Sequence, residues 1–489
     1  MKRPTVPEFV RAATLPALVP VDPGAGRAAS AEAVETLLVT AAFSNADEVH
    51  PAVLAAKRTY TEASRAAFAW TVFEAWLAAG ADPKHAWCMQ MVGFLGDDAS
   101  ARKLSALAKE WPGQNAAARA QAALDALLNI GTDTALVHIN LLAEKSKYPA
   151  FKAAAKERID AIADARGLSS DELADRLVPT LGLDEPGADR LDYGPRQFRV
   201  AFDETLSPVV VDLATGRVLG DLPKPSKADD KELAKVAKTK LAALKKDAKL
   251  TASLQIARLE RAMRTGRRIA PALFLEAFAA HPWMRHLTRR LGLGVFEGAG
   301  GAPTATFRIA EDGSLASAED RAFELPEGAL VGLVHPVHLE ADERRRWSEQ
   351  FADYELLQPF PQLGRPVYVV SDAERDAKAL ARFDGLKATY GALRGLEARG
   401  WQRWMDDSVV FAKPLSGQAG SRGARGAYAV LSTTPGWHPS QTADDIEPQA
   451  VERIGLYDRH DPDLTLDRLD RVTFSELVYD VELALASRA

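Results

Sequence analysis

The spacing of apolar residues changes once along the chain, near Pro179, and this change constrains the fold more than any other feature. Between residues 31 and 179, apolar side chains recur at steps of three and four, as at Phe68, Val72 and Trp76. Such spacing is typical of amphipathic helices. Turn-forming residues interrupt it at 80–83, 96–98, 111–113 and 131–133. We therefore expect consecutive helices of about 15 residues each.

Residues that favour helix starts accompany these breaks. Asp97, Asp133 and Ser169 stand where N-caps are expected, and Ser169 with Glu172 has the spacing of a capping box. Short alanine-rich helices in succession suggest a HEAT-like stack, in which each helix pair buries its apolar face against its neighbours. No repeat consensus aligns, so a plain helical bundle is the alternative. Either arrangement predicts a scaffold on which a partner protein docks.

Beyond Pro179 the apolar spacing becomes that of strands. Residues 197–203 and 208–213 alternate in steps of two, and Gly216 indicates a turn. A lysine-rich stretch follows that is typical of a solvated helix face. We expect an α+β chain with four parts: an extended arm at 1–30, an all-α HEAT-like region at 31–180, a β-ribbon connector at 181–222 and a mixed α+β domain at 223–489.

Within the last part, several elements are predicted. A helix is expected over 251–268, strands over 306–310 and 329–334, and a turn at 311–313. Further on, residues 380–404 favour a helix with a break near Gly400. A strand at 408–412, a glycine-rich loop at 416–426, a second strand and a closing helix at 474–485 complete the domain.

Composition excludes several classes of protein. The chain has 489 residues, of which 47% are hydrophobic, and its formal net charge of −6 argues against a nucleic-acid coat protein. Its single cysteine, Cys88, cannot form an internal disulfide and fits a reducing cytosol. No apolar run is long enough for a signal peptide or a membrane helix. We therefore expect a cytoplasmic protein that does not bind membranes.

An arginine stripe is the first candidate binding feature. Arg258, Arg261, Arg264 and Arg268 share one face of the helix predicted over 251–268, opposite the apolar residues. Guanidinium groups bind phosphate and carboxylate in a bidentate manner, so this face predicts an anion site. The alternative is that the arginines are solvated or pair with acids, for which Glu260 and Glu276 are nearest in sequence.

Two histidines and two acids form a second candidate. His335 and His338 flank Pro336-Val337 at the expected end of a strand, but no third ligand has metal-site spacing, so no metal is expected. Glu311, Asp312 and His335 would form an acid/base set if the fold brought them together. Acids in a turn are more often turn formers, and a histidine next to proline more often caps a loop.

Five other polar residues complete the predicted ligand-binding set: His281, Arg308, Gln358, Gln362 and Arg365. Glutamine and arginine side chains among aromatic residues can bind a planar polar ligand such as a base. They can equally donate hydrogen bonds to the backbone of their own loop. Convergence of these side chains in one concave pocket would favour the first interpretation.

Several strings of residues, taken in order, resemble a known family. They are RLERAM, HPWMRHLTRRL, TFRIAEDGSL, GLVHPVHL, FADYELLQPFPQLGRPVY and FSELVYDVEL. Together they resemble a bacterial domain of unknown function from the carboxy-terminal part of MolR-like proteins, which are named for a supposed role in regulating molybdate metabolism. The resemblance covers roughly residues 160–489. Some members lie beside MoxR-type ATPases, which implies a protein partner of that kind. Larger members carry a WGR domain, but this chain has no Trp-Gly-Arg core.

Three functions therefore compete. The first is a regulatory or scaffolding protein, with a helical region for partner docking and an arginine-lined groove in the α+β domain. The second is an enzyme or ligand sensor for a small molecule or nucleotide that bears phosphate or carboxylate. The third is a nucleic-acid binder that uses the arginines between Arg258 and Arg290. No catalytic signature or cofactor motif distinguishes them.

Overall fold

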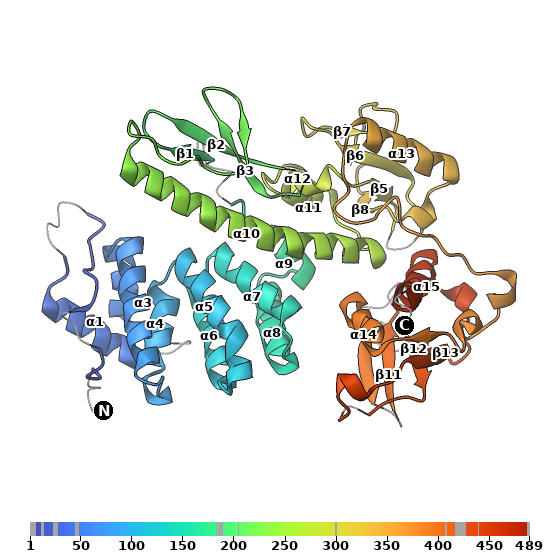
Figure 1. Cartoon of the computed structure of the whole chain (residues 1–489), viewed down its shortest axis with the longest axis horizontal. Coiled ribbons are helices and arrows are strands. Elements are labelled where there is room, and N and C mark those ends of the chain that lie inside the picture. Colours follow the sequence, from blue (N-terminus) through green and yellow to red (C-terminus); the bar gives the residue numbers. More distant parts are fainter. Residues whose placement is uncertain are drawn as a thin grey trace. The chain divides into compact units, whose positions relative to one another are not determined.

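A computed structural model describes residues 6–10, 14–22, 28–44, 48–181, 183, 189–203, 205–298, 301–405, 408–415, 427–438 and 440–486. The chain divides into two compact units, Met1–Pro179 and Thr180–Ala489 (Figure 1). The first is helical and the second combines sheets with helices, so the predicted α+β class is confirmed. In the described part of the chain, no helix is both long and apolar enough to cross a membrane.

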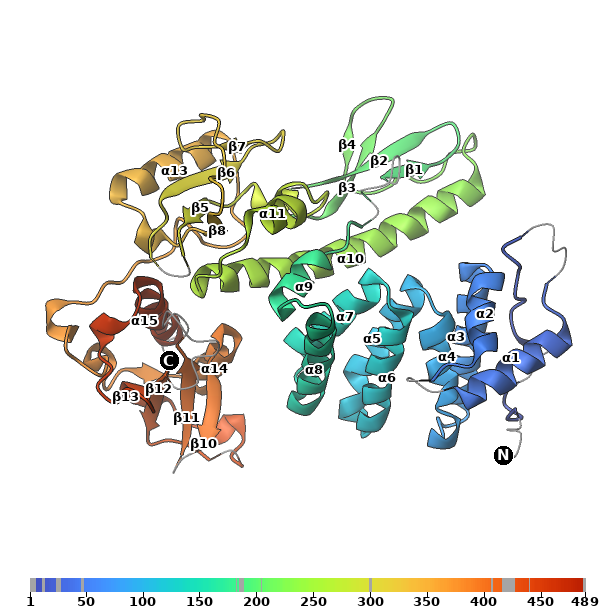
Figure 2. The same ribbon diagram turned by 180° about the vertical axis from the view of Figure 1, so that it is seen from behind.

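The first unit consists of short helices in a row. They are α1 (Ala31–Phe43), α2 (Pro51–Thr59), α3 (Glu62–Ala78), α4 (Trp87–Leu95), α5 (Asp98–Glu110), α6 (Ala117–Ile130), α7 (Asp133–Lys145), α8 (Pro149–Ala165) and α9 (Ser170–Arg176). Within the row, α4, α6 and α8 contact one another in succession, α5 contacts α7, and α5/α6 and α7/α8 pack as pairs (Figure 2). Two layers of stacked helix pairs are the arrangement of a HEAT-like stack.

Caps and burial explain why these helices form where they do. Asp97 accepts a hydrogen bond from the Ser100 amide, and Ser169 with Glu172 forms the predicted capping box. The N-cap of α7 is Thr132, one residue before the predicted Asp133. Cys88 is fully buried, and burial raises the pKa of its thiol to about 12, so thiolate chemistry is excluded there.

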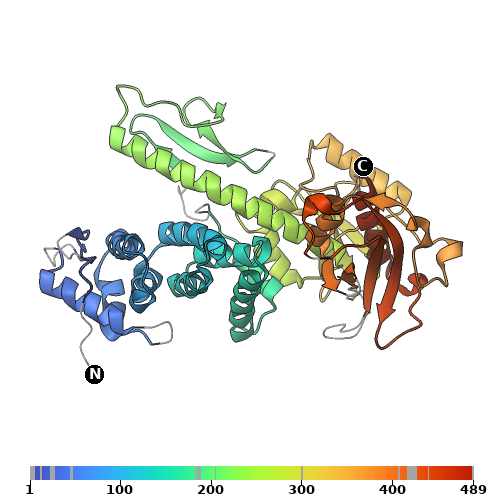
Figure 3. The same cartoon turned by 60° about the horizontal axis from the view of Figure 1, so that its bottom comes forward.

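The second unit begins with a four-stranded antiparallel sheet. Its strands are β1 (Arg190–Asp192), β2 (Gln197–Phe202), β3 (Pro208–Asp212) and β4 (Val218–Leu219), in the order β1-β2-β3-β4. The helix α10 (Lys231–Arg264) runs along this sheet (Figure 3) and buries Ala234, Ala237 and Leu241 against it. Its 34 residues span about 50 Å. The lysine-rich and arginine-rich stretches therefore form one helix, because no glycine or proline interrupts 231–264.

A second sheet follows, in the order β7-β6-β5-β8. It contains β5 (Leu293–Phe296), β6 (Ala305–Ile309), β7 (Leu315–Ala316) and β8 (Leu330–Leu333), and its helical elements are α11 (Pro271–Phe274), η5 (Leu275–Ala279), α12 (Arg285–Thr288), η6 (Pro336–His338) and α13 (Ala341–Asp353). Trp347 of α13 is buried and donates a hydrogen bond to Thr306 Oγ1 over 3.0 Å. This contact fixes α13 against β6.

The third sheet has the order β10-β11-β12-β13-β9. Its elements are β9 (Lys387–Ala388), β10 (Gln402–Met405), β11 (Val409–Pro414), β12 (Ala427–Thr434) and β13 (Gln449–Asp458), with η8 (Ala381–Phe383), α14 (Tyr390–Gly395), η9 (Leu396–Arg399) and the closing helix α15 (Arg471–Ala486). Phe474, Leu477 and Val481 of α15 join the core formed with this sheet. The glycine-rich loop at 416–426 lies outside the described residues.

One secondary-structure prediction in this region is wrong. Residues 380–404, expected to be a helix, form η8, β9, α14, η9 and β10 instead. Glycines at 385 and 400 adopt positive φ and end the helical turns, while β9 pairs with β13 and β10 pairs with β11. Tertiary strand pairing thus overrides the helical propensity of this Ala/Leu/Arg-rich stretch.

Candidate functional site

Two acids on the buried side of α15 organise the polar interior of the second unit. Glu476 and Asp480 lie one helical turn apart, and their side chains are 2% and 0% exposed. They stand among apolar residues such as Leu477 and Val478. Ionised carboxylates at such depth require cationic partners, because an unpaired buried charge is strongly destabilising.

Glu476 has three cationic partners, all arginines, and a fourth polar partner, His335. Arg365 binds it in a bidentate manner, with its Nε at 2.5 Å and its Nη2 at 2.8 Å from the carboxylate oxygens. His335 Nε2 lies 3.0 Å from Oε1, Arg264 Nε lies 3.1 Å from Oε2 and Arg399 Nη2 lies 3.2 Å from Oε2. One carboxylate therefore joins α10, the loop before residue 366, the end of β8 and η9.

Asp480 continues this network. Its carboxylate accepts hydrogen bonds from Arg399, from Trp401 Nε1 over 2.9 Å and from Lys413 Nζ over 2.6 Å. Glu260 of α10 pairs with Arg365 Nη1 over 2.9 Å. We call the eight residues Glu260, Arg264, His335, Arg365, Arg399, Lys413, Glu476 and Asp480 the Glu476 cluster.

The charges of this cluster nearly balance. Burial opposes ionisation of Glu476, yet hydrogen bonds from His335 and Arg365 hold the pKa of this carboxyl well below its usual range. Burial also lowers the pKa of Lys413 and, with the nearby charge of Arg399, that of Arg264. The cluster contains four Lys or Arg side chains and three carboxylates, so its cations are compensated mainly from within the chain.

The protonation of His335 follows from its hydrogen bonds. Its Nδ1 accepts a hydrogen bond from the Val337 amide over 3.1 Å, so the ring proton is on Nε2 and is donated to Glu476. The imidazole is neutral in this arrangement and is 1% exposed. It therefore caps the turn at Pro336 and orients Glu476.

The same capping pattern occurs at the other His-Pro pairs. His281 Nδ1 accepts hydrogen bonds from the amides of Trp283 and Met284. His50 and His438 each accept a hydrogen bond through Nδ1 from the amide two residues ahead. Proline fixes the backbone at the first position of the turn, and the imidazole satisfies the next amide.

The two predicted glutamines also bind their own chain. Gln362 is fully buried and bridges the main chains of Gly292 and Val334, with three hydrogen bonds of 2.8 Å each. Gln358 accepts a hydrogen bond from the Leu363 amide over 2.9 Å and donates one to Gln362. These contacts hold the loop that delivers Arg365 to Glu476.

The arginine stripe does not form the single outward face expected from the sequence. Arg258 is buried and donates a hydrogen bond to Gln255 over 2.8 Å, Arg264 pairs with Glu476, and Arg261 is half-buried. Arg268 lies beyond the end of α10, with its guanidinium 3.4 Å from the centre of the Phe296 ring. The reason is that α10 packs against both β8 and α15, so more than one side of this helix is covered.

The remaining candidates lie in separate environments. Arg308 is buried, pairs with Asp320 over 2.7 Å and stacks on Tyr354. Glu311 and Asp312 are exposed in the turn between β6 and β7, where Asp312 accepts hydrogen bonds from Ser314. The carboxylate that contacts His335 is Glu476, so the proposed acid/base set is not assembled around Glu311 and Asp312.

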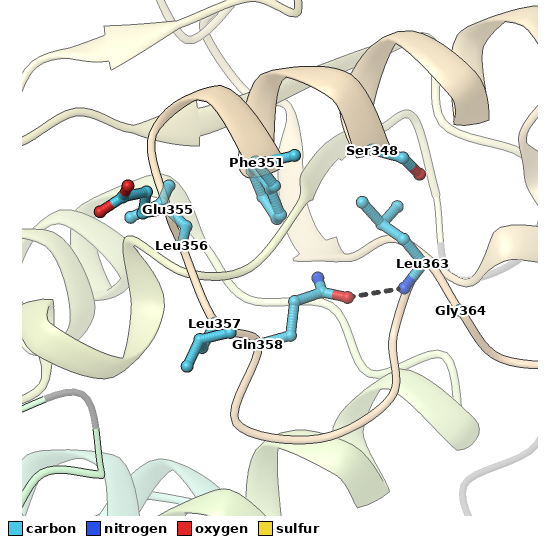
Figure 4. A pocket seen from close by; sticks show the side chains of 9 residues that line it. Ser348, Phe351, Glu355, Leu356, Leu357, Gln358, Leu363 and Gly364 are labelled. Atoms are coloured by element: carbon cyan, nitrogen blue, oxygen red, sulfur yellow. Dashed lines mark hydrogen bonds between the residues drawn. The ribbon is translucent and has the colours of Figure 1, made fainter.

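A surface hollow of roughly 580 Å³ lies beside the loop that carries Gln358 (Figure 4). One face of α13 forms its first wall and the segment 356–364 forms the other. The lining residues are Ser348, Phe351, Ala352, Glu355, Leu356, Leu357, Gln358, Leu363 and Gly364. Among these described residues Glu355 alone is charged, so the hollow is mainly apolar and differs in chemistry from the Glu476 cluster.

No group of three His, Cys, Asp or Glu residues in the described ranges is placed to hold a metal ion. His335 and His338, the pair considered for metal binding, have ring centres 6.5 Å apart. The rings of His338 and Phe296 make an edge-to-face contact, with their centres 6.4 Å apart.

Comparisons with known proteins find similarity over part of the chain. Residues 216–401 match the sequence model of a domain of unknown function, DUF4132. This span contains α10, the second sheet, α13 and the hollow. The chain is also similar to the uncharacterized protein YehI of Escherichia coli strain K12, with 39% identity over 349 residues. That alignment covers 71% of this chain and 29% of the relative. No solved structure matches the chain.

Sequence reasoning missed the two acids at the centre of the cluster. Glu476 and Asp480 lie in the string FSELVYDVEL, where two acids four residues apart interrupt an otherwise apolar helix. That pattern predicts either a polar stripe or buried carboxylates with cationic partners. It could have directed attention to the arginines as partners of α15.

Proposed function

We propose that this protein is a cytoplasmic regulatory or scaffolding protein that acts by binding another protein. The observation that supports this most is the internal pairing of the candidate polar residues. His335 and Arg365 bind Glu476, and Gln362 binds main chain, so these side chains are committed to holding the fold. A ligand site needs polar groups that converge on an open cavity, and the open hollow is mainly apolar.

The helical unit supports the same proposal. Stacked helix pairs expose an extended surface that suits partner docking rather than chemistry. Its single cysteine is buried and its thiol stays protonated. By the family resemblance, a MoxR-type ATPase is the partner class to test first.

One observation favours a ligand sensor as the second candidate. Arg268 is partly buried, and burial lowers the pKa of its guanidinium to about 10. Its hydrogen bond goes to the Arg267 carbonyl, and no ion pair joins it to a carboxylate among the described residues. A bound phosphate or carboxylate would supply the missing negative charge.

Thermal denaturation separates the two candidates. A ligand that binds only the folded chain raises the melting temperature by mass action. We expect inorganic polyphosphate and nucleotides to leave the melting temperature of the full chain unchanged. A rise that Arg268→Gln abolishes, and Arg321→Gln on the exposed surface does not, would replace the scaffold proposal with the sensor.

The scaffold itself is tested by reconstitution. The full chain, immobilised, is exposed to native cytosol, and each captured protein is purified and returned to the purified chain. We expect a stoichiometric complex of defined mass with one of them. Failure of every captured protein to form such a complex would overturn the proposal.

A further inference from the structure

The hollow beside α13 has the size and chemistry of a peptide-binding site. Phe351, Leu356 and Leu363 line its floor and walls, and Leu357 at its edge is 59% exposed (Figure 4). A volume of roughly 580 Å³ accommodates one or two large side chains rather than a single atom group. When a partner covers a leucine that is exposed to this degree beside an apolar wall, the burial of its apolar surface stabilises the complex.

The backbone at the edge of the hollow has a conformation that its side chain disfavours. Glu355 has a φ of 53°, in the left-handed region. It is the first residue after the cap of α13 in a Schellman motif, because the Leu356 amide donates to the Phe351 carbonyl and the Glu355 amide donates to the Ala352 carbonyl. Glycine is preferred at this position, yet the chain places a carboxylate there.

The charge at this helix end is uncompensated. Carbonyl groups at a helix C-terminus carry partial negative charge, which favours basic residues nearby. The last turn of α13 has no basic residue, and Asp353 and Glu355 are both exposed there. Neither carboxylate makes an ion pair with another described residue. The carboxylates of Asp353 and Glu355 and the C-terminus of α13 therefore all attract a cation from outside the chain to the edge of this apolar hollow.

The second wall offers main-chain groups as well. Residues 356–358 belong to no helix or strand, and within the described structure the amides of Leu357 and Gln358 make no main-chain hydrogen bond. Extended peptides commonly bind along such segments through main-chain hydrogen bonds and gain specificity from alternate side chains.

We propose that the hollow binds an extended segment of a partner protein, which inserts one bulky apolar side chain against Phe351 and Leu357 and places a neighbouring Lys or Arg against Glu355. This proposal rests on the proposed function, since it names the chemistry of the protein that the scaffold binds. The apolar side chain supplies affinity and the basic residue fixes the direction of the peptide.

A random-peptide display library, selected against the full chain, tests the proposal. We expect enrichment of sequences with Leu, Ile, Phe or Trp one to three positions from Lys or Arg. An enriched peptide, labelled and titrated by fluorescence polarisation, should bind Leu357→Asp at least about tenfold more weakly. Glu355→Gln should cost about two- to fivefold, as for an exposed ion pair. Val218→Asp, an equally exposed apolar residue on β4, is the matched control and should bind normally.

A charge exchange sharpens the test. Glu355→Lys should reject the basic peptide and prefer the same peptide with Glu in place of Lys. Enriched peptides that bind Leu357→Asp as well as the unchanged chain would overturn the proposal, and so would a selection without consensus. A chain that self-associates, and that Leu357→Asp converts to monomer, would show a second copy as the occupant instead.

The proposal and the function on which it rests fail differently. If Leu357→Asp still forms the reconstituted complex, the hollow is not the docking site while the scaffold function stands. If no captured protein forms a complex but the peptide consensus appears and depends on Glu355, the scaffold proposal is overturned while the hollow still binds peptides.

Discussion

Glu476 is the residue on which the interior of the second unit most depends. Its two oxygens meet Arg264, Arg365 and Arg399 as well as His335. Cationic side chains that close would repel one another without it. Its importance is structural, since replacing a buried carboxylate leaves several positive charges with too little compensation.

Glu476→Gln is therefore expected to lower the free energy of unfolding by about 3–5 kcal/mol, the cost of breaking a buried ion pair. Urea denaturation of the full chain measures this change. Glu482→Gln serves as the control because Glu482 is exposed on the same helix, and it should change stability by less than about 0.5 kcal/mol. Equal midpoints for the two variants would contradict the role assigned to Glu476.

Two histidines make stability depend on pH. Burial and the nearby charges of Arg268 and Arg471 lower the pKa of His338 from 6.5 to about 4. Burial and three neighbouring arginines lower the pKa of His286 equally, to about 4. Between pH 6.5 and 4 the unfolded chain binds more protons at these sites, so stability falls as the pH falls through this window.

Denaturation at pH 7 and pH 5 checks this expectation. The loss of stability between these values should shrink in the double variant His286→Gln with His338→Gln. The exposed His460→Gln should leave it unchanged. If all three proteins lose the same stability on acidification, other groups control the acid response.

At the scale of single residues, sequence predicts the type of interaction but not the partner. Arg365 was predicted to bind a planar polar ligand or the backbone of its own loop, and its planar fork of N–H donors binds a carboxylate instead. Its carboxylate, Glu476, lies 111 residues further along the chain. Glu260 was proposed as an internal partner of the arginine stripe, and it pairs with Arg365 from outside that stripe. Spacing within one helix carries no information on such contacts.

At the scale of elements, local pattern predicted the helical stack well but, in the third sheet, only the strands β11 and β12. Helices α3 to α6 end at the predicted turn residues because each break carries glycine, proline or a capping side chain. By contrast, β9 has two residues and pairs with β13, which lies far along the chain, and β10 is a four-residue strand that forms a hairpin with β11. Four-residue strands with few apolar residues give almost no periodic signal.

The C-terminal end of α13 allows an element-scale prediction. Glu355→Gly should raise the free energy of unfolding by up to about 1 kcal/mol, because glycine adopts positive φ without the steric cost that Glu355 bears. Glu349→Gly, in the middle of the same helix, should lower it by about 1 kcal/mol. Chemical denaturation distinguishes the two signs, and a destabilising Glu355→Gly would contradict the strain argument. The stabilised variant should also bind the basic peptide less tightly, a trade of function for stability.

At the scale of the whole molecule, each unit holds its own apolar core. One core in the first unit extends from Val10 to Leu177. In the second unit, separate apolar clusters surround Phe198, Trp347 and Phe411. The polar Glu476 cluster joins α10, the loop after α13 and α15, so the second unit depends on contacts far apart in sequence. The division into four parts that sequence suggested stays a prediction.

This difference between the units predicts how the chain tolerates cutting. A fragment of residues 1–179 should fold alone and unfold cooperatively, because stacked helices bury their faces against sequence neighbours. Residues 180–489 should also fold as one fragment.

A cut at 247/248 inside α10 should prevent the second unit from folding. The cut separates Ala234 and Leu241, which pack on the first sheet, from Glu260 and Arg264 in the Glu476 cluster. Circular dichroism with thermal unfolding of the four fragments measures this. A fragment 1–179 without a cooperative transition would contradict the independence of the first unit. A pair 180–247 and 248–489 that folds as well as the intact unit would contradict the assignment of α10 as the element that unites the second unit.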